Sequence, residues 1–176
     1  SDADSSAAQP LFDAATEALT RNATEVRADA FGLPLAQDDT ASVYAKPSVF
    51  LSEGESLQFD VTVPAEGEFS LAFDLATPTD SIVPEAQMTV DYSFPVVDLQ
   101  RFKLPIYYRN AADTFPKDRY GNDALIPQVR EVRWTTTPAR DINFSEPYPL
   151  RMRLSAGDHH FNFALTEGAI YLGSIY

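Results

Sequence analysis

The sequence predicts an all-β protein, a β-sandwich preceded by an N-terminal helix and an extended lead-in. Three observations support this prediction. Apolar and polar residues alternate in several short segments from residue 57 to the end of the chain, as in strands with one buried face. Gly, Pro and Asp, which favour turns, stand between these segments. A helical period is confined to residues 11–19.

The N-terminal quarter is predicted to hold a linker, a helix and a lead-in. The first residues are small and polar, as is typical of a linker. Apolar residues recur at spacings of four after Pro10, which suits a first helical turn, so a helix is predicted over residues 10–21. Residues 23–47 show no sustained period and form the lead-in. We therefore divide the chain into residues 1–43 and a sandwich over residues 44–176.

The strands of the sandwich follow from the alternation. Residues 57–63 and 69–75 are predicted to form an antiparallel pair with one face in the core. Further strands are predicted over residues 87–94, 129–134, 150–154, 161–165 and 170–175, with turns at residues 64–67 and 155–158 and a bulge at Gly173. The residues expected to be buried are Phe59, Val61, Phe73, Met152, Phe161, Phe163 and Leu172. Seven or eight short strands favour a sandwich over a βαβ fold.

The composition excludes several classes of function. The chain has no cysteine, which removes disulfides, thiol catalysis and thiolate metal sites, and fits a bacterial exported protein that folds without oxidation. Its net charge of −13 over 176 residues argues against nucleic-acid binding and is attributed to solubility. No apolar run approaches the roughly 18 residues that a transmembrane helix needs, and no signal peptide is visible.

Residues 101–134 differ from the rest of the chain. This segment carries seven of the 13 basic residues against four acidic ones, together with the only Trp and three Tyr. It is too long for an ordinary hairpin turn, and long loops in compact domains are usually functional. These basic residues are suited to bind an acidic sugar or a carboxylate. The preferred interpretation is that they balance the first 100 residues, which hold 18 of the 26 acids.

The order of these features resembles a known family. The features are the first strand pair, the run Lys117-Asp118-Arg119-Tyr120-Gly121-Asn122, Trp134, residues 151–154, Ala156-Gly157-Asp158-His159 and the last strand. Over about residues 44–176 this pattern resembles the galactose-binding-like jelly rolls of carbohydrate-binding modules. More narrowly, it is similar to the β-sandwich region of large bacterial extracellular solute-binding lipoproteins of sugar ABC transporters. The resemblance implies an extracytoplasmic jelly roll and glycan binding, and it carries no defined set of binding residues.

A ligand is expected on the surface made by residues 103–123, because binding residues concentrate on long loops and the turns are too short to build a concave wall. Aromatic rings there would stack on a sugar while charged and amide side chains bond its hydroxyls. The candidate ligand-binding residues are Tyr107, Tyr108, Arg109, Asp118, Arg119, Tyr120, Asn122 and Trp134. Two alternatives stay open: Trp134 packs in the core, or the loop folds over the sandwich and its tyrosines cap the core.

No metal site or catalytic residue is assigned. Asp118, Asn122 and Asp123 are spaced for a calcium loop, but the closing Glu is missing, and turn chemistry is the preferred interpretation. His159 and His160 are adjacent on a strand, so they face opposite sides and cannot chelate one ion together. No nucleophile elbow or phosphate loop is present, and no carboxylate pair can be nominated. No cofactor is therefore predicted, with calcium as the alternative.

These observations favour a non-catalytic carbohydrate-binding or accessory module of a bacterial cell-surface or solute-binding protein. Its partners would be a glycan or small polar ligand and a neighbouring domain of the same protein. One alternative is a structural or adhesive spacer domain without a small ligand. A second is a glycan hydrolase with an unrecognised carboxylate pair.

Overall fold

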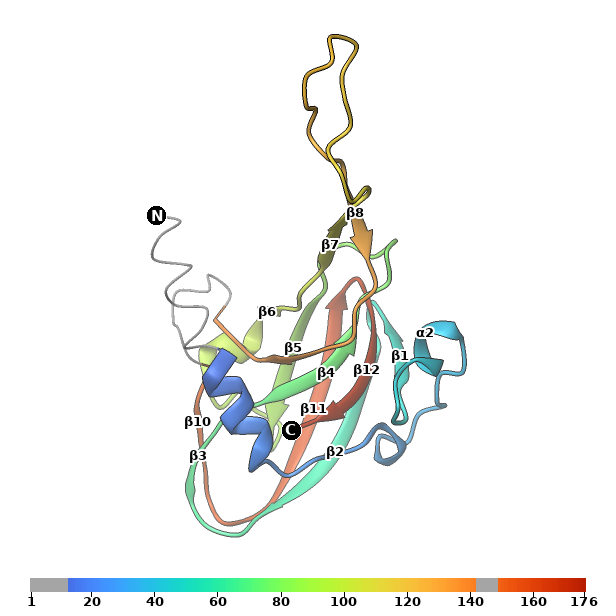
Figure 1. The fold of residues 1–176 in the computed structure, drawn as a ribbon. Helices are drawn as coiled ribbons and strands as arrows, with labels where there is room; N and C mark the ends of the chain where they lie inside the picture. Colours follow the sequence, from blue (N-terminus) through green and yellow to red (C-terminus); the bar gives the residue numbers. More distant parts are fainter. Residues whose placement is uncertain (1–12, 142–148) are drawn as a thin grey trace.

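A computed structural model describes residues 13–141 and 149–176, which fold into two antiparallel sheets packed face to face (Figure 1). Sheet A has the strand order β1-β12-β4-β9, and sheet B has the order β2-β11-β5-β6. The strands of sheet A are β1 (Val49–Ser52), β12 (Ala169–Ile175), β4 (Ala72–Ala76) and β9 (Thr135–Pro138). Those of sheet B are β2 (Ser56–Val63), β11 (Gly157–Glu167), β5 (Glu85–Val90) and β6 (Phe102–Lys103).

Two smaller ribbons accompany the sandwich. Strand β3 (Gly67–Phe69) pairs with β10 (Met152–Leu154), and β7 (Tyr107–Asn110) pairs with β8 (Gln128–Glu131). The remaining short elements are η1 (Ala28–Ala30), α2 (Asp39–Ser42) and η2 (Val97–Gln100). In the described part of the chain no helix is long and apolar enough to cross a bilayer.

The N-terminal helix is confirmed over residues 13–21, whereas residues 10–12 lie outside the described ranges. After it, the lead-in joins sheet A: Val26 and Ile175 exchange two backbone hydrogen bonds, of 2.8 and 2.9 Å. Phe31 then enters the core against Phe59. At α2 the carboxylate of Asp38 accepts a hydrogen bond from the Ala41 N–H at 3.0 Å and caps the helix. The division at residue 43 stays a prediction.

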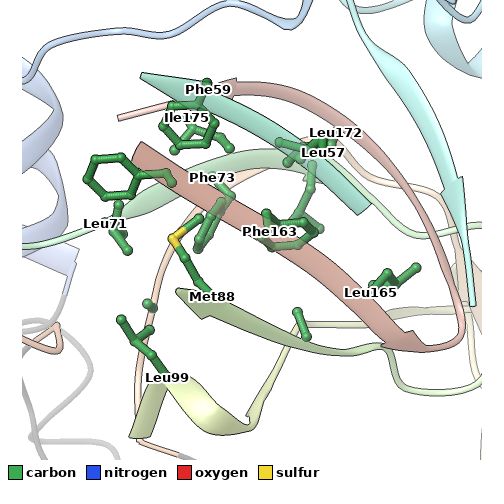
Figure 2. Close-up of a cluster of buried hydrophobic side chains, with 14 of the residues drawn as sticks. Leu57, Phe59, Leu71, Phe73, Met88, Leu99, Phe163, Leu165, Leu172 and Ile175 are labelled. Carbon is green, nitrogen blue, oxygen red and sulfur yellow. The ribbon is translucent and has the colours of Figure 1, made fainter. Parts of the chain in front are cut away.

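The core lies between the two sheets (Figure 2). Phe73 of β4 and Phe163 of β11 are fully buried and meet across the sandwich with ring centroids 5.5 Å apart. Of the residues predicted to be buried, all are confirmed except Val61, which is half-buried. Val61 lies near the end of β2, where it lines an apolar hollow beside the N-terminal helix, and this hollow leaves its side chain partly open to solvent.

The predicted pairing of residues 57–63 with 69–75 is wrong. Strand β2 pairs with β11, placing Phe59 opposite Phe161, whereas β4 pairs with β12 and places Leu75 opposite Leu172. The two strands therefore belong to different sheets. Alternation reports that a strand has one buried face, but in a sandwich both sheets bury a face against the same core, so the pattern does not identify the neighbour.

Three other predicted boundaries are also corrected. Strand β5 stops at Val90 instead of continuing to residue 94, because a tight turn follows. The strand predicted over residues 129–134 ends at Glu131 as β8, and the next strand, β9, begins only at Thr135 and belongs to a different sheet. Strand β11 already begins at Gly157, inside the predicted turn, and pairs with β2 and β5.

The unusual central segment forms a projecting ribbon, which we call the arm (residues 107–131). Strands β7 and β8 are its root, and the chain between them extends away from both sheets (Figure 1). Although the segment is too long for an ordinary hairpin turn, it forms one long hairpin, with a further antiparallel β-bridge between Lys117 and Asp123 near its tip. Every residue from 108 to 123 is exposed, so the alternative that this loop caps the core is wrong.

Candidate functional site

Six of the eight candidate ligand-binding residues lie on the exposed part of the arm. They are Tyr108, Arg109, Asp118, Arg119, Tyr120 and Asn122. The tip is an Asx-type turn: one carboxylate oxygen of Asp118 accepts hydrogen bonds from the N–H groups of Tyr120, at 2.8 Å, and Asn122, at 3.0 Å. Gly121 supplies the positive φ of 80° that the turn needs. That these six residues contact a ligand stays a prediction.

The turn also accounts for the calcium-like spacing. The Asp118 carboxylate is bonded to the backbone of its own turn, and the Asp123 carboxylate is paired with Lys117. Across residues 13–141 and 149–176 no group of three or more His, Asp or Glu side chains is arranged to hold a metal ion.

The other two candidate residues lie at the base of the arm, beside the sandwich. The Tyr107 hydroxyl is 2.9 Å from the Thr135 hydroxyl of β9, and the Arg133 guanidinium lies over the Tyr107 ring at 4.8 Å. Trp134 immediately precedes β9. The structure therefore separates the predicted site into two groups and places Tyr107 and Trp134 on either side of one edge strand.

The basic residues of this segment are mostly committed to partners within the protein. Arg101 makes a two-pronged ion pair with Glu85, at 2.7 and 2.9 Å, which lowers the pKa of that carboxyl. Arg130 donates to the carbonyls of Ser81, at 2.7 Å, and Pro78, at 3.0 Å, and so anchors the root of the arm. Only the first of these pairs joins a base of the segment to an acid in the first 100 residues, so the charge-balance interpretation holds in part.

A groove runs along β9, the edge strand of sheet A. It consists of three hollows of about 170, 460 and 490 Å³, all of which include Thr136 in their walls. We call it the β9 groove. The N-terminal helix and β9 each contribute three of its principal lining residues, and the others come from the surrounding segments. These lining residues are Glu17, Thr20 and Arg21; Thr135, Thr136 and Thr137; and Tyr44, Asp74, Lys103, Tyr107, Trp134, Arg140 and Tyr176. Thr136, whose hydroxyl bonds to Asp74, lines all three hollows, while Trp134 lines the smallest and Tyr107 the largest.

The Trp134 end is built by aromatic stacking. The Trp134 and Tyr44 rings are nearly parallel, 12° apart, with centroids 4.1 Å from each other. The indole N–H donates to the Thr40 carbonyl at 2.9 Å and fixes the ring plane. Trp134 is half-buried and lies outside the cluster of core residues, so it does not pack in the core as the alternative supposed.

Beneath this aromatic pair lies a buried carboxylate. Asp74 of β4 is 7% exposed and accepts hydrogen bonds from three hydroxyls: Tyr44 at 2.7 Å, Tyr176 at 2.9 Å and Thr136 at 2.6 Å. Burial, together with the bond to this carboxylate, raises the pKa of Tyr44 to about 12. These bonds occupy both carboxylate oxygens and hold the hydroxyls that line this end of the β9 groove in fixed orientations.

A cation completes the network on the outer side. The Lys46 ammonium bonds to the Tyr176 hydroxyl at 3.1 Å and to the Glu25 carboxylate at 2.5 Å, and Glu25 also accepts from Ser174 at 2.6 Å. The hydrogen bond from Lys46 lowers the pKa of Glu25 and raises the pKa of Lys46 itself. The lead-in, the last strand and β4 are thereby linked behind the groove.

The approach of Tyr44 to sheet A depends on Gly173, where the predicted bulge interrupts the pairing of β12 with β4. A Cβ at this position would lie 2.5 Å from the ring carbon and from the hydroxyl oxygen of Tyr44. Gly173→Ala is expected to push Tyr44 away from Trp134 and to lower the free energy of unfolding by about 1–3 kcal/mol. Thermal denaturation measures the loss, and the emission of the only Trp reports the displaced ring.

Gly67→Ala is the matched control, because the nearest side-chain atom to the added Cβ would be 3.7 Å away. It is expected to leave the emission unchanged. Unchanged stability and unchanged emission in Gly173→Ala would contradict the role assigned to Gly173.

Few features of the sequence point to this site. Tyr44 and Asp74 come from segments far apart in the chain, and neither was among the candidate residues. The one usable signal was a charged residue inside an otherwise apolar run, Leu71 to Ala76, since an acid on a buried strand is retained only with partners.

Comparison with known proteins supports the fold. Neither a protein-family model nor a curated protein sequence matches the chain. A cycloisomaltooligosaccharide glucanotransferase of Paenibacillus sp., solved with cycloisomaltoheptaose, is 19% identical with a TM-score of 0.50, and the match covers 86% of this chain and 18% of that enzyme. This chain therefore corresponds to about a fifth of the enzyme's length.

Two smaller proteins show a weaker likeness. A carbohydrate-binding module, CBM36, solved with calcium and xylotriose, is 8% identical with a TM-score of 0.45, over 88% of this chain and 98% of the module. A module of Cellvibrio mixtus lichenase 5A, solved with cellotriose, is 14% identical with a TM-score of 0.43, over 86% and 93%. The sheet order above and the likeness to the glucanotransferase confirm the predicted class, a β-sandwich of jelly-roll type.

Proposed function

We propose that this chain is a non-catalytic carbohydrate-binding module that takes an oligosaccharide in the β9 groove. The observation that carries the proposal is that the hydroxyl-bearing Thr136 lines all three hollows, with Trp134 in the wall of one and Tyr107 in the wall of another. Aromatic side chains can cover the apolar face of a sugar ring, while hydroxyl and carboxylate groups bond its hydroxyls in either direction. A groove of this kind has room for several linked sugars.

The charges along the groove favour a neutral saccharide. The hollow at Tyr107 is lined by Lys103 and Arg140 and also by Asp13 and Glu17, and the next hollow is lined by Glu17 and Arg21. Acids and bases are therefore mixed along the groove, and neither sign dominates. A chain of neutral sugars would meet donors and acceptors throughout without leaving a charge of its own unpaired.

The context proposed for the module is a larger bacterial protein at the cell surface, such as a solute-binding protein, with a neighbouring domain in the same chain. The resemblance of residues 44–176 to such regions supports this, as does the bacterial enzyme of which a similar sandwich is one part. Both oxygens of Asp74 accept hydroxyl bonds, and a hydrolase would have to release them before using this carboxylate. Calcium at the arm tip would likewise have to displace the bonds that Asp118 makes to its own turn.

Two double variants test where the sugar binds. Glu17→Ala with Thr20→Ala removes two polar side chains from the helix wall of the groove. Arg119→Ala with Tyr120→Ala removes two side chains from the tip of the arm. All but Thr20 are exposed, so both proteins are expected to keep the melting temperature of the wild type. On a glycan array followed by calorimetry, the groove variant is expected to bind about tenfold more weakly, because it loses hydrogen bonds from a charged and a neutral group.

The arm variant is the matched control, and it also tests the ligand contacts that the sequence predicts for Arg119 and Tyr120. Loss of binding in the arm variant alone would move the site to the arm. Absence of glycan binding in the wild type would favour a spacer domain, and release of shorter sugars from a bound glycan would favour a hydrolase.

A further inference from the structure

A tight turn after β5 has an unusual backbone. Val90 and Ser93 bond to each other in both directions, at 2.8 and 3.2 Å, with Asp91 and Tyr92 between them. The φ angles of Asp91 and Tyr92 are 51° and 67°. Positive φ at both central positions defines a type I′ turn, which normally contains Asn-Gly or Gly-Gly. A bulky residue such as Tyr92 keeps this conformation only where its surroundings impose it, and such strain often marks a functional position.

The surroundings that impose it are two consecutive residues of β11. One oxygen of the Asp91 carboxylate accepts the His160 backbone N–H at 2.9 Å, and the other lies 2.6 Å from Nδ1 of His159. Nε2 of His159 lies 2.7 Å from the carbonyl oxygen of Ser155. Both partners of the His159 ring can only accept, so the ring donates from both nitrogens and carries a proton on each. The imidazolium thus clamps the turn to the strand.

The turn presents an aromatic ring to solvent. Tyr92 is 82% exposed, and its ring stacks on that of His160 with centroids 5.1 Å apart and an angle of 24°. His160 is held in place by Asp60, at 2.7 Å, and Gln58, at 2.8 Å, both on β2. One face of Tyr92 therefore rests on a fixed support, which leaves the other open on the outer face of sheet B.

We propose that Tyr92 is a second saccharide platform, on the opposite sheet from the β9 groove, and that the protonated His159 ring helps to hold it in its presented position. A sugar ring would stack on the open face of Tyr92. Asp60, with a side chain 75% exposed, and Asn162, the next outward residue of β11, would bond its hydroxyls. The proposal goes beyond the function proposed above, because it uses a different sheet and gives the chain two binding surfaces.

The charged groups around His159 are acids. Asp91 follows β5, Asp158 precedes His159 on β11, and Asp60 lies on β2, where it is engaged with His160. The Ser155 carbonyl, and then Asp91, raise the pKa of His159. The clamp is therefore complete while His159 is protonated. It loses one of its two ring bonds, but keeps the bond from the His160 N–H to Asp91, as pH rises through the raised pKa. Saccharide binding at Tyr92 should therefore weaken as the pH rises.

Tyr92→Gly distinguishes a platform from a structural residue. Glycine suits positive φ, so this variant should melt at the same temperature as the wild type or higher, whereas loss of a structural contact would lower the melting temperature. On an array of neutral glucan, xylan and mannan oligosaccharides, it should lose signals that the groove variant Glu17→Ala with Thr20→Ala retains. Tyr92→Asn, which also tolerates positive φ, repeats the test with a polar side chain. Identical array signals for the wild type and both Tyr92 variants would overturn the platform, whatever happens at the groove.

The clamp is tested by repeating the array at pH 5.5 and pH 8.5. The array signals that are lost in the Tyr92 variants should be several-fold stronger at the lower pH in the wild type. This difference should vanish in His159→Gln, because the glutamine side chain does not titrate. Signals that depend on Tyr92 but do not change with pH would overturn the clamp.

Discussion

Replacing Phe163 by alanine is expected to lower the free energy of unfolding by about 3–5 kcal/mol, as for other large aromatic residues in well-packed cores. Phe163 is fully buried on β11, and its ring lies near that of Phe73 from the opposite sheet (Figure 2), with centroids 5.5 Å apart. The Phe102 ring of β6 lies 6.3 Å from it, centroid to centroid. The substitution therefore removes the contacts that join β4, β6 and β11 and leaves a cavity that the surrounding strands cannot close. Denaturant unfolding monitored by far-UV circular dichroism measures the loss.

Phe115→Ala provides the matched control, since that ring is 59% exposed on the arm. The same change of residue type there is expected to alter stability by less than about 0.5 kcal/mol. Similar losses in both variants would mean that Phe163 does not join the sheets as described.

Trp134→Ala is expected to have the largest effect on sugar binding, about a 30-fold loss of affinity, which corresponds to about 2 kcal/mol. The substitution removes the indole that lines one end of the β9 groove and leaves Tyr44 without its stacking partner. It also removes the donor to the Thr40 carbonyl, so a stability loss of about 1–3 kcal/mol should accompany it. Calorimetry at a temperature well below the melting point separates the two effects.

Trp134→Phe controls for the loss of stability. It keeps an aromatic plane against Tyr44 but loses the N–H that bonds to Thr40. We expect it to share part of the stability loss and to bind sugar within a few-fold of the wild type. Wild-type affinity in a folded Trp134→Ala protein would exclude this end of the groove from binding.

The arm shows where prediction from sequence stopped. The composition of residues 101–134 correctly marked this segment as unusual, and the Asx chemistry of Asp118 and Gly121 was predicted from local sequence because it involves neighbours only. The direction in which the segment leaves the sandwich was not predicted. That direction depends on contacts of its root, such as Arg130 with the carbonyls of Ser81 and Pro78, residues about 50 positions earlier in the chain.

By itself the sequence determined local features of this protein: the N-terminal helix, most of the side chains that face the core, and strands in the regions of β2, β4, β5, β8, β10, β11 and β12. It did not predict strands β1, β6, β7 and β9. The predicted features follow from periodicity, which records the environment of each residue along its own element. Only the tertiary structure decided which strands are neighbours, and hence that Asp74 meets Tyr44 and Tyr176, and that His159 meets Asp91. Such pairs join residues that are 30 to 102 positions apart, and the free energy that selects them comes from burial and hydrogen bonding in the assembled sandwich. No local pattern records that free energy.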